Sequence, residues 1–219
     1  MASDNLHRGQ PILTAGTPLE RATIAMVMLH GRGASASDIL SLADEFGNAD
    51  VAYLAPQAAG STWYPNRFSA PVNSNEPWLT SALGVVADVL SLVATAGIPL
   101  ERTLLLGFSQ GACLGLEYVA RNPKPYGGVV GLSGALIENG DAQRLYSGTL
   151  ERAPVFLGCS TTDPHVPRER VERSAEVFRG LGAEVMLRLY PNMDHTVNLE
   201  EIQFIRGMVV SIQNSLEGS

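Results

Sequence analysis

Cysteine is nearly absent from this chain. Cys113 and Cys159 are the only cysteines among its 219 residues, and neither has the C-x-x-C spacing of a metal-ligand or redox motif. Two cysteines cannot form the framework of bridges that holds a small secreted domain together. We therefore expect both to be buried small side chains.

Positive charge is also scarce. The chain has 15 lysines and arginines against 22 aspartates and glutamates, which gives a net charge of −7. Nucleic acids and anionic membrane surfaces are densely negative and attract basic proteins. The composition therefore argues against a nucleic-acid partner and against a membrane-surface partner.

Long apolar runs, repeats and charged linkers are missing as well. The first ten residues, MASDNLHRGQ, lack the apolar core of a secretory signal, and the most apolar long stretch, residues 82–97, includes Asp88 and two glycines. That stretch is too short and too polar to be expected to span a bilayer. We expect a cytoplasmic protein with no membrane span, folded as one domain over residues 1–219.

Apolar, strand-like runs alternate with helix-like segments along most of the chain. Strands are predicted over 23–29, 51–56, 102–108, 127–133, 153–159 and 184–190, and helices over about 37–46, 76–96, 110–121, 168–181 and 199–216. Ser37 is the predicted cap of the first helix, and residues 11–16 are a candidate antiparallel edge strand. This order predicts an α/β fold with a mostly parallel sheet, helices on both faces, and active groups where the strands end.

Ser109 stands between two glycines where a predicted strand meets a predicted helix. The run GFSQG, residues 107–111, follows TLLL and precedes ACLGLEYVA. The chain must reverse within about one residue here, which strains the serine backbone and leaves room only for glycine at the flanks. The pattern and its context predict that Ser109 is a nucleophile.

A nucleophilic serine needs a histidine base, and with this type of turn the chain order is serine, acid, histidine. Only His165 and His195 follow Ser109. His195 lies in the loop after the last predicted strand and is the predicted base. His165 is expected to be a neighbour of the acid.

The predicted acid is Asp163, which follows the strand at 153–159. Its other interpretation is a turn former, because Asp-Pro is common turn chemistry. Asp194 is a rival for the acid role, although its side chain should diverge from the adjacent His195. Asp141 follows no strand end closely.

The segment LHGRG, residues 29–33, follows the first buried strand. Two glycines separated by one residue let the backbone approach a ligand with an N–H group exposed. Enzymes with a G-x-S-x-G turn take one oxyanion donor from such a loop and one from the residue after the serine. Arg32 and Gln110 are therefore the predicted oxyanion-hole donors, through their backbone N–H groups.

A long connection, residues 56–77, lies between the second strand and the second helix. Connections of this length without secondary structure are uncommon and often functional. Trp63, Tyr64 and Phe68 in this loop, together with Met193 beside the predicted base, are the predicted substrate-contacting residues. The alternative is that the aromatic residues anchor the loop to the core.

The sequence resembles the phospholipase/carboxylesterase family of α/β-hydrolases, which includes bacterial carboxylesterases and acyl-protein thioesterases. The resemblance rests on LHGRG, LLLGFSQGACLGL, LSGAL, STTDPHVP and YPNMDH, in the family's order and spacing. It implies a compact α/β-hydrolase without a large cap domain, and hydrolysis of carboxylic or thio esters without metal or organic cofactor. It also implies a triad of Ser109, Asp163 and His195 with oxyanion donors at Arg32 and Gln110.

Arg32 departs from the family pattern. Thioesterase members usually carry an apolar residue between the two glycines, which puts a long acyl substrate in doubt. Together with Arg67, Arg32 is compatible with an anionic or polar substrate. The alternative is that both arginines are solvated or paired with surface carboxylates.

Several functions are compatible with these motifs. We expect a serine esterase that acts on small-molecule esters, as a monomer or homodimer. The alternatives are a lysophospholipase or acyl-protein thioesterase, a lactonase similar to dienelactone hydrolase, and an inert ligand-binding protein. Lactonases of that kind usually have a cysteine nucleophile, which Ser109 argues against.

Overall fold

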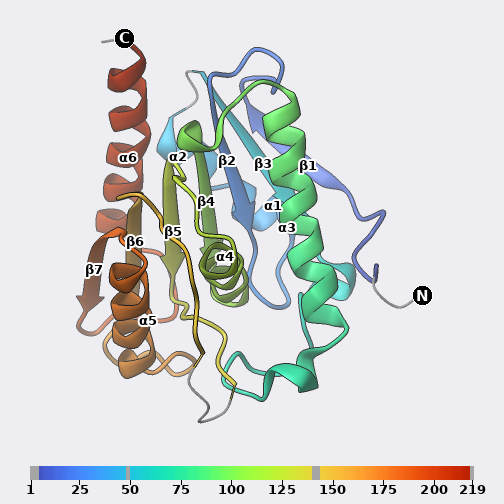
Figure 1. Cartoon of the computed structure of the whole chain (residues 1–219), viewed down its shortest axis with the longest axis vertical. Helices are drawn as coiled ribbons and strands as arrows, with labels where there is room; N and C mark the ends of the chain where they lie inside the picture. Colours follow the sequence, from blue (N-terminus) through green and yellow to red (C-terminus); the bar gives the residue numbers. More distant parts are fainter. Residues whose placement is uncertain (1–4, 48–49, 140–143, 218–219) are drawn as a thin grey trace.

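Seven strands form one sheet through the middle of the molecule (Figure 1). In the computed structural model, which describes residues 5–47, 50–139 and 144–217, the strand order is β1-β3-β2-β4-β5-β6-β7. The strands are β1 (Ile12–Gly16), β2 (Ile24–Leu29), β3 (Val51–Pro56), β4 (Thr103–Phe108), β5 (Gly128–Leu132), β6 (Pro154–Ser160) and β7 (Glu184–Tyr190). Every neighbouring pair is parallel except β1 with β3. The predicted α/β fold and its antiparallel edge strand are confirmed.

Helices cover both faces of the sheet. They are α1 (Ala36–Leu40), α2 (Ala43–Phe46), α3 (Trp78–Thr95), α4 (Gln110–Arg121), α5 (Arg168–Gly180) and α6 (Leu199–Glu217). The apolar side chains form two buried clusters, one beneath α3, α4 and α5 and the other beneath α1, α2 and α6. Strand β2 supplies both clusters, because alternate residues of a strand point to opposite faces. Figure 1 views the sheet from the side covered by α3, α4 and α5.

The first helix begins at a different residue from the one predicted. Ser35, not Ser37, is the N-cap of α1: its hydroxyl accepts the N–H of Asp38, and the Asp38 carboxylate accepts the N–H of Ser35. This reciprocal pair satisfies two N–H groups at once, which the Ser37 position does not offer. The predicted single helix is also divided in two, α1 and α2.

Helix α3 needs a further correction. Its 18 residues have a mean hydropathy of 1.6, so by length and composition alone it could cross a membrane, contrary to the expectation from residues 82–97. Seven of its side chains are nevertheless buried, and the apolar ones among them join the core beneath α3, α4 and α5. This packing is the behaviour of the core helix of a globular α/β protein.

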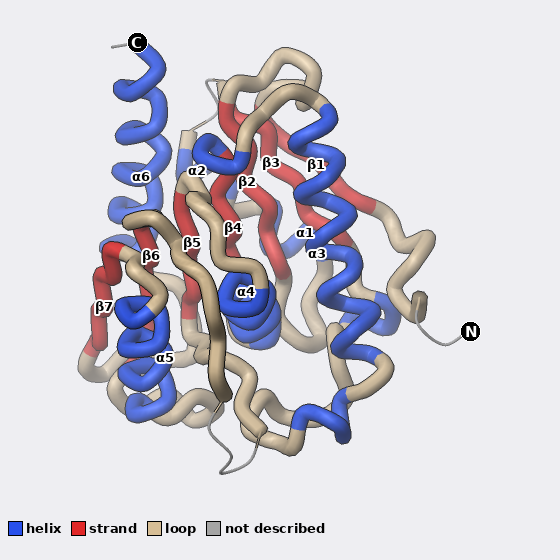
Figure 2. The backbone as a smooth tube through the Cα atoms, in the orientation of Figure 1, coloured by secondary structure: helices blue, strands red, loops and turns tan. Residues whose placement is uncertain are grey.

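The parallel strands all end at one edge of the sheet, the lower edge in Figure 1. Long loops gather there, as Figure 2 shows, including the connection between β3 and α3. No large cap domain is present among the residues that the structure describes. One domain over residues 1–219 stays a prediction.

Candidate active site

Ser109 forms the sharp turn between β4 and α4. Its backbone has φ 54° and ψ −118°, a conformation that L-residues rarely adopt. A Cβ atom at Gly107 would lie 2.4 Å from the backbone of Gly111, and one at Gly111 would lie 2.2 Å from the carbonyl oxygen of Leu29. The turn therefore requires glycine at both flanks, and it holds the hydroxyl of Ser109 above the end of the sheet.

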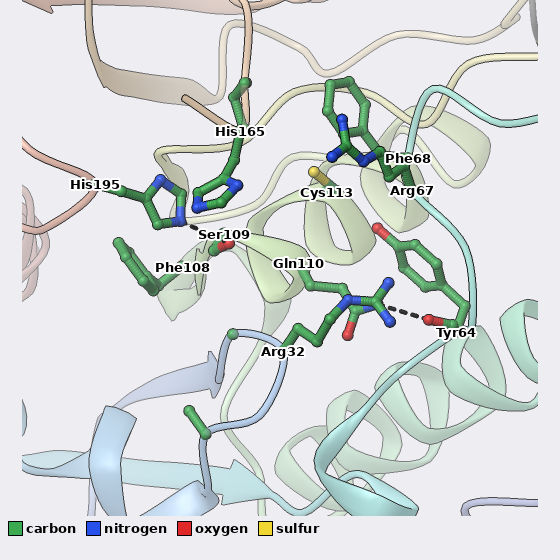
Figure 3. Close-up of a pocket in the computed structure, with 13 residues that line it drawn as sticks. Arg32, Tyr64, Arg67, Phe68, Phe108, Ser109, Gln110, Cys113, His165 and His195 are labelled. Atoms are coloured by element: carbon green, nitrogen blue, oxygen red, sulfur yellow. Dashed lines mark hydrogen bonds between the residues drawn. The ribbon is translucent and has the colours of Figure 1, made fainter. Parts of the chain in front are cut away.

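His195 lies between Ser109 and Asp163. Its Nε2 atom is 2.9 Å from the Ser109 hydroxyl oxygen, and its Nδ1 atom is 2.7 Å from a carboxylate oxygen of Asp163. The three side chains come from the loops after β4, β6 and β7. Figure 3 shows the His195 ring directed at Ser109. With the proton on Nδ1, the imidazole donates to Asp163 and accepts from the serine hydroxyl.

The surroundings of Asp163 favour its ionised form. Burial raises the pKa of this carboxyl, but hydrogen bonds from His195 and from the backbone N–H groups of His165 and Val166 outweigh that effect, so the net pKa lies below its usual value. The two backbone bonds measure 2.8 and 3.0 Å. Asp163 thus shapes its own turn and contacts His195, which combines both interpretations of the residue.

The rival acid that the structure describes, Asp194, does not join this group. Asp194 is exposed, and no hydrogen bond or ion pair between its side chain and His195 occurs among the described residues. Asp141 lies outside the described residues. Of Asp163 and Asp194, only Asp163 contacts the imidazole in the described part of the chain.

The two predicted oxyanion donors lie beside the serine turn. A Cβ atom at Gly31 would be 3.3 Å from the Cβ atom of Ser109, so the loop after β2 passes directly next to the nucleophile. The backbone N–H groups of Arg32 and Gln110 have no acceptor within the described part of the chain. Both are therefore available to a ligand, and that of Gln110 belongs to the first turn of α4.

The side chains of Gln110 and Arg32 have a separate task that the sequence did not indicate. The buried Gln110 amide accepts the N–H of Trp63 at 2.9 Å and donates to the carbonyl of Tyr64 at 2.8 Å. The Arg32 guanidinium donates to the carbonyls of Pro65 and Asn66 at 2.9 and 2.7 Å. Both side chains tie the connection at residues 56–77, called the aromatic loop below, to the candidate oxyanion hole.

A cavity of about 390 Å³ opens beside Ser109 (Figure 3). Its walls are Gly31, Arg32, Ala34, Tyr64, Arg67, Phe68, Phe108, Ser109, Gln110, Cys113, His165, Val166 and His195. Tyr64 and Phe68 thus take the place expected of them. Cys113 and Tyr64 line it although both residues are buried.

Two of the predicted substrate contacts lie elsewhere. Trp63 is fully buried and donates its ring N–H to the carbonyl of His30 at 2.8 Å, so it anchors the loop. The Met193 sulfur faces the side-chain amide of Asn198 at 2.9 Å. Neither residue lines the cavity. A place in the long loop, for Trp63, and a place beside the predicted base, for Met193, did not determine where these side chains point.

His165 and Phe108 are neighbours of His195 that the sequence argument left without a role at the cavity. Their ring centroids lie 4.8 and 5.1 Å from that of His195. Phe108 occupies the first unspecified position of the G-x-S-x-G motif, and His165 follows the acid by two positions. Their places next to the motifs were the available signal. Both rings pack against the imidazole and limit its rotation.

Among the described residues, no group of three or more histidine, cysteine, aspartate or glutamate side chains could hold a metal ion. The chemistry available at this site is that of a serine, an imidazole, a carboxylate and backbone donors.

The strand order, the strained serine turn and the position of the site at the carboxyl ends of the strands define an α/β-hydrolase. A model of the phospholipase/carboxylesterase family matches residues 14–212, and the chain belongs to that family. The resemblance drawn from the motifs is confirmed.

Individual relatives agree with this assignment. A crystal structure of a phospholipase/carboxylesterase from Dyadobacter fermentans is 42% identical, with a TM-score of 0.88, and covers 92% of this chain and 97% of that one. Acyl-protein thioesterase 1 of Yarrowia lipolytica is 25% identical over 84% of this chain and 89% of its own length. Acyl-protein thioesterase 1 of Gibberella zeae is 34% identical, but the match spans only 52% of this chain and 49% of that protein.

Membership of this family makes the chain an enzyme, a carboxylic ester hydrolase of the serine-hydrolase type. The alternative of an inert ligand-binding protein is therefore not supported. The family does not by itself fix the substrate or the residues that carry the reaction.

Proposed function

We propose that this enzyme is a serine esterase that hydrolyses small carboxylic or thio esters through an acyl-enzyme intermediate. Ser109 is the nucleophile, His195 the general base and acid, and Asp163 the residue that orients the imidazole. The backbone N–H groups of Arg32 and Gln110 form the oxyanion hole. No metal or organic cofactor takes part in this scheme.

The first half of the reaction acylates the enzyme. His195 takes the hydroxyl proton of Ser109 as the oxygen attacks the ester carbonyl, and the carbonyl oxygen becomes an oxyanion held by the two N–H groups. His195 then gives the proton to the leaving alcohol or thiol. Asp163 stabilises the positive imidazole throughout.

The second half releases the acyl group. His195 takes a proton from a water molecule, which attacks the acyl carbonyl along the same path, and Ser109 leaves with the proton returned by the imidazole. The sum is ester plus water to acid plus alcohol. Each donor is used twice, so the site needs no rearrangement between the two halves.

One observation carries this proposal: His195 bridges Ser109 and Asp163 with hydrogen bonds of 2.9 and 2.7 Å. The strained backbone of Ser109 supports the nucleophile role. The two unpaired backbone N–H groups next to it support the oxyanion role.

The test is covalent labelling with a fluorophosphonate probe, which reacts with activated serines. The native enzyme should take up one probe per chain, and Ser109→Ala should take up none. Ser69→Ala is the matched control, because Ser69 is an exposed serine of the aromatic loop, and it should label like the native enzyme. Labelling of the Ser109 variant at the native level would refute the proposal.

Small substrates fit the site better than long acyl chains. The cavity holds about 390 Å³, and charged or polar groups of Arg32, Arg67 and His165 interrupt its apolar walls. A series of p-nitrophenyl esters from two to sixteen carbons in the acyl chain tests this. We expect kcat/KM to peak among the short esters, and a peak at the longest chains would favour the acyl-protein thioesterase alternative. A cytoplasmic location and a monomeric or homodimeric state remain predictions.

A further inference from the structure

The cavity beside Ser109 is lined by arginines and by no carboxylate in the part of the chain that the structure describes. Its arginines are Arg32 and Arg67, and no aspartate or glutamate is among the described residues that line it. The whole chain has a net charge of −7. The charge of the cavity lining, with two arginines and no carboxylate, is thus opposite in sign to the net charge of the chain.

Arg67 has no internal partner for its charge. It is exposed on the aromatic loop, and no described residue forms an ion pair or a side-chain hydrogen bond with its guanidinium group. Eight other arginines each have a carboxylate oxygen within 3.9 Å, namely Arg121, Arg144, Arg152, Arg168, Arg170, Arg173, Arg188 and Arg206. The charge of Arg67 is therefore available to a ligand.

Arg32 is held in place without being neutralised. Its guanidinium group donates to the carbonyl oxygens of Pro65 and Asn66 and lies 6.0 Å from the centre of the Tyr64 ring. Carbonyl oxygens and an aromatic ring carry no net charge, so the full positive charge stays at the cavity wall. Fixed in this way, Arg32 loses little further freedom when an anion approaches.

The two ends of the cavity differ in what they offer a substrate. In Figure 3, His165 and His195 lie on one side of Ser109, and Arg32, Arg67 and Tyr64 lie on the other. The leaving alcohol must sit near His195, which gives it a proton. The acyl part of the ester is therefore directed toward the side that holds the arginines.

We propose that the substrates are esters whose acyl part carries a free carboxylate, and that Arg67 binds this carboxylate while Arg32 adds to the positive field. The proposal rests on the serine esterase function given above. Hydrolysis of such a half-ester adds one water and releases a dicarboxylate, an alcohol and one proton, which passes to the solvent. Arg67 suits this task because the planar guanidinium group pairs with both oxygens of a carboxylate. The Phe68 ring beside it would cover the methylene groups between the ester and the acid.

The experiment compares monoethyl succinate, glutarate and adipate with the corresponding primary amides, which have the same length but no charge. The readout is the ratio of kcat/KM for each acid to that for its amide, at low ionic strength. The native enzyme should prefer the acid for at least one chain length. Arg67→Gln should lower that ratio by about fivefold, the upper range for a partly exposed ion pair. Arg67→Lys should retain part of the preference.

The matched control is Arg21→Gln. Arg21 is exposed just before β2, at the opposite edge of the sheet from Ser109. This variant changes the net charge by the same amount and should keep the native ratio. An equal ratio in the native and Arg67→Gln enzymes, or a native preference for the amides, would overturn the proposal.

A further ester separates the acyl side from the alcohol side. Carboxymethyl butyrate carries its carboxylate on the leaving group, and its hydrolysis should not depend on Arg67. A loss with Arg67→Gln on this ester alone would contradict the assignment to the acyl part. Failure of the esterase function itself has a different signature, which is the lack of Ser109-dependent hydrolysis of any ester, neutral or charged.

Discussion

Among single residues, Asp163 has the most partners at the site. Its carboxylate has no exposure to solvent, contacts the Nδ1 atom of His195, and accepts two backbone N–H groups of its own turn. Asparagine has nearly the same shape, but its NH2 group would face the Nδ1–H group of His195, so two donors would meet. If the imidazole proton moves to Nε2 instead, His195 can no longer accept the proton of Ser109. The hydrogen-bond role and the turn role of this residue can therefore be separated by one substitution.

We expect Asp163→Asn to lower kcat by about 10⁴, as the corresponding change does in serine proteases. The control is Asp194→Asn, because Asp194 is exposed and adjacent in sequence to His195. It should change kcat by less than about threefold, in line with a surface substitution. Steady-state kinetics on p-nitrophenyl acetate measure both. The opposite ranking would transfer the acid role to Asp194.

The site residues differed in how well the sequence could locate them. Ser109, Asp163 and His195 could be located because each follows a buried strand, and the ends of parallel strands meet at one edge. Trp63 and Met193 could not, because a side chain in a loop may point to the core or to the cavity. The Trp63 side chain points to the core, where its ring N–H donates a hydrogen bond to the carbonyl of His30.

At the level of elements, the site depends on how closely α4 approaches the end of β2. A Cβ atom at Gly111 would lie 2.2 Å from the carbonyl oxygen of Leu29 and 2.6 Å from that of His30. Both atoms are backbone, so the clash can be relieved only by moving the helix or the strand. The same movement would separate the two candidate oxyanion donors.

We therefore expect Gly111→Ala to lower the free energy of unfolding by about 1–3 kcal/mol, as overpacking does, and to reduce kcat more than KM. Gly207→Ala is the control. Gly207 lies inside α6 with no atom within 4 Å of the position of a Cβ, so alanine there should stabilise the protein by about 1 kcal/mol. Urea unfolding and steady-state kinetics distinguish the two. A Gly111 variant as stable and active as the native enzyme would show that this close approach is not required.

The sequence predicted the strands better than the helix starts. Each predicted strand is a strand of the sheet, and the continuous apolar runs of β2 and β3 are buried on both faces. Strand β7 is only partly buried. The region 37–46 has two candidate caps close together. Ser35 is the cap in place of Ser37 because it pairs reciprocally with Asp38. Leu42 is the N-cap of a second short helix where one continuous helix was predicted.

Across the whole molecule, two buried histidines join the N-terminal segment to the site. His7 accepts the N–H of Ala59 through Nδ1 and donates through Nε2 to the carbonyl of Trp63. His30 accepts the N–H of Ala58 through Nε2 and donates through Nδ1 to the carbonyl of Gly31. Burial lowers the pKa of both histidines. The nitrogen atoms that accept from Ala58 and Ala59 cannot do so when protonated.

These histidines predict a loss of stability in mild acid. Because their pKa values are lower in the folded than in the unfolded state, the unfolded state binds more protons below about pH 6.5. The free energy of unfolding should therefore be constant above that pH, as far as these groups contribute, and decrease as the pH falls below it. Urea unfolding at pH 7.5, 6.5 and 5.5 measures this. His30→Gln should be less stable at pH 7.5 and show a shallower decrease, and an unchanged slope would contradict the assignment.

A buried carboxyl acts in the opposite direction. Glu201 is inaccessible to solvent in the first turn of α6, where one oxygen accepts the N–H of Asn198 and the other has no partner among the described residues. A Cβ atom at Gly158 would lie 2.1 Å from that second oxygen. Burial raises the pKa of Glu201 to about 7. The carboxyl is therefore protonated in a pH range where an exposed glutamate is ionised.

Glu201 should destabilise the fold as the pH rises. The folded state holds the proton more tightly than the unfolded state, so this contribution to stability is complete below about pH 4.5 and is lost as the pH rises to about 7. Glu201→Gln has no such titration. The difference in unfolding free energy between the variant and the native enzyme should shift in favour of the variant by about 3 kcal/mol between pH 5 and pH 8. The comparison within one pH series removes any constant cost of the amide group. A difference that stays the same at both pH values would mean that Glu201 is ionised in the folded protein throughout.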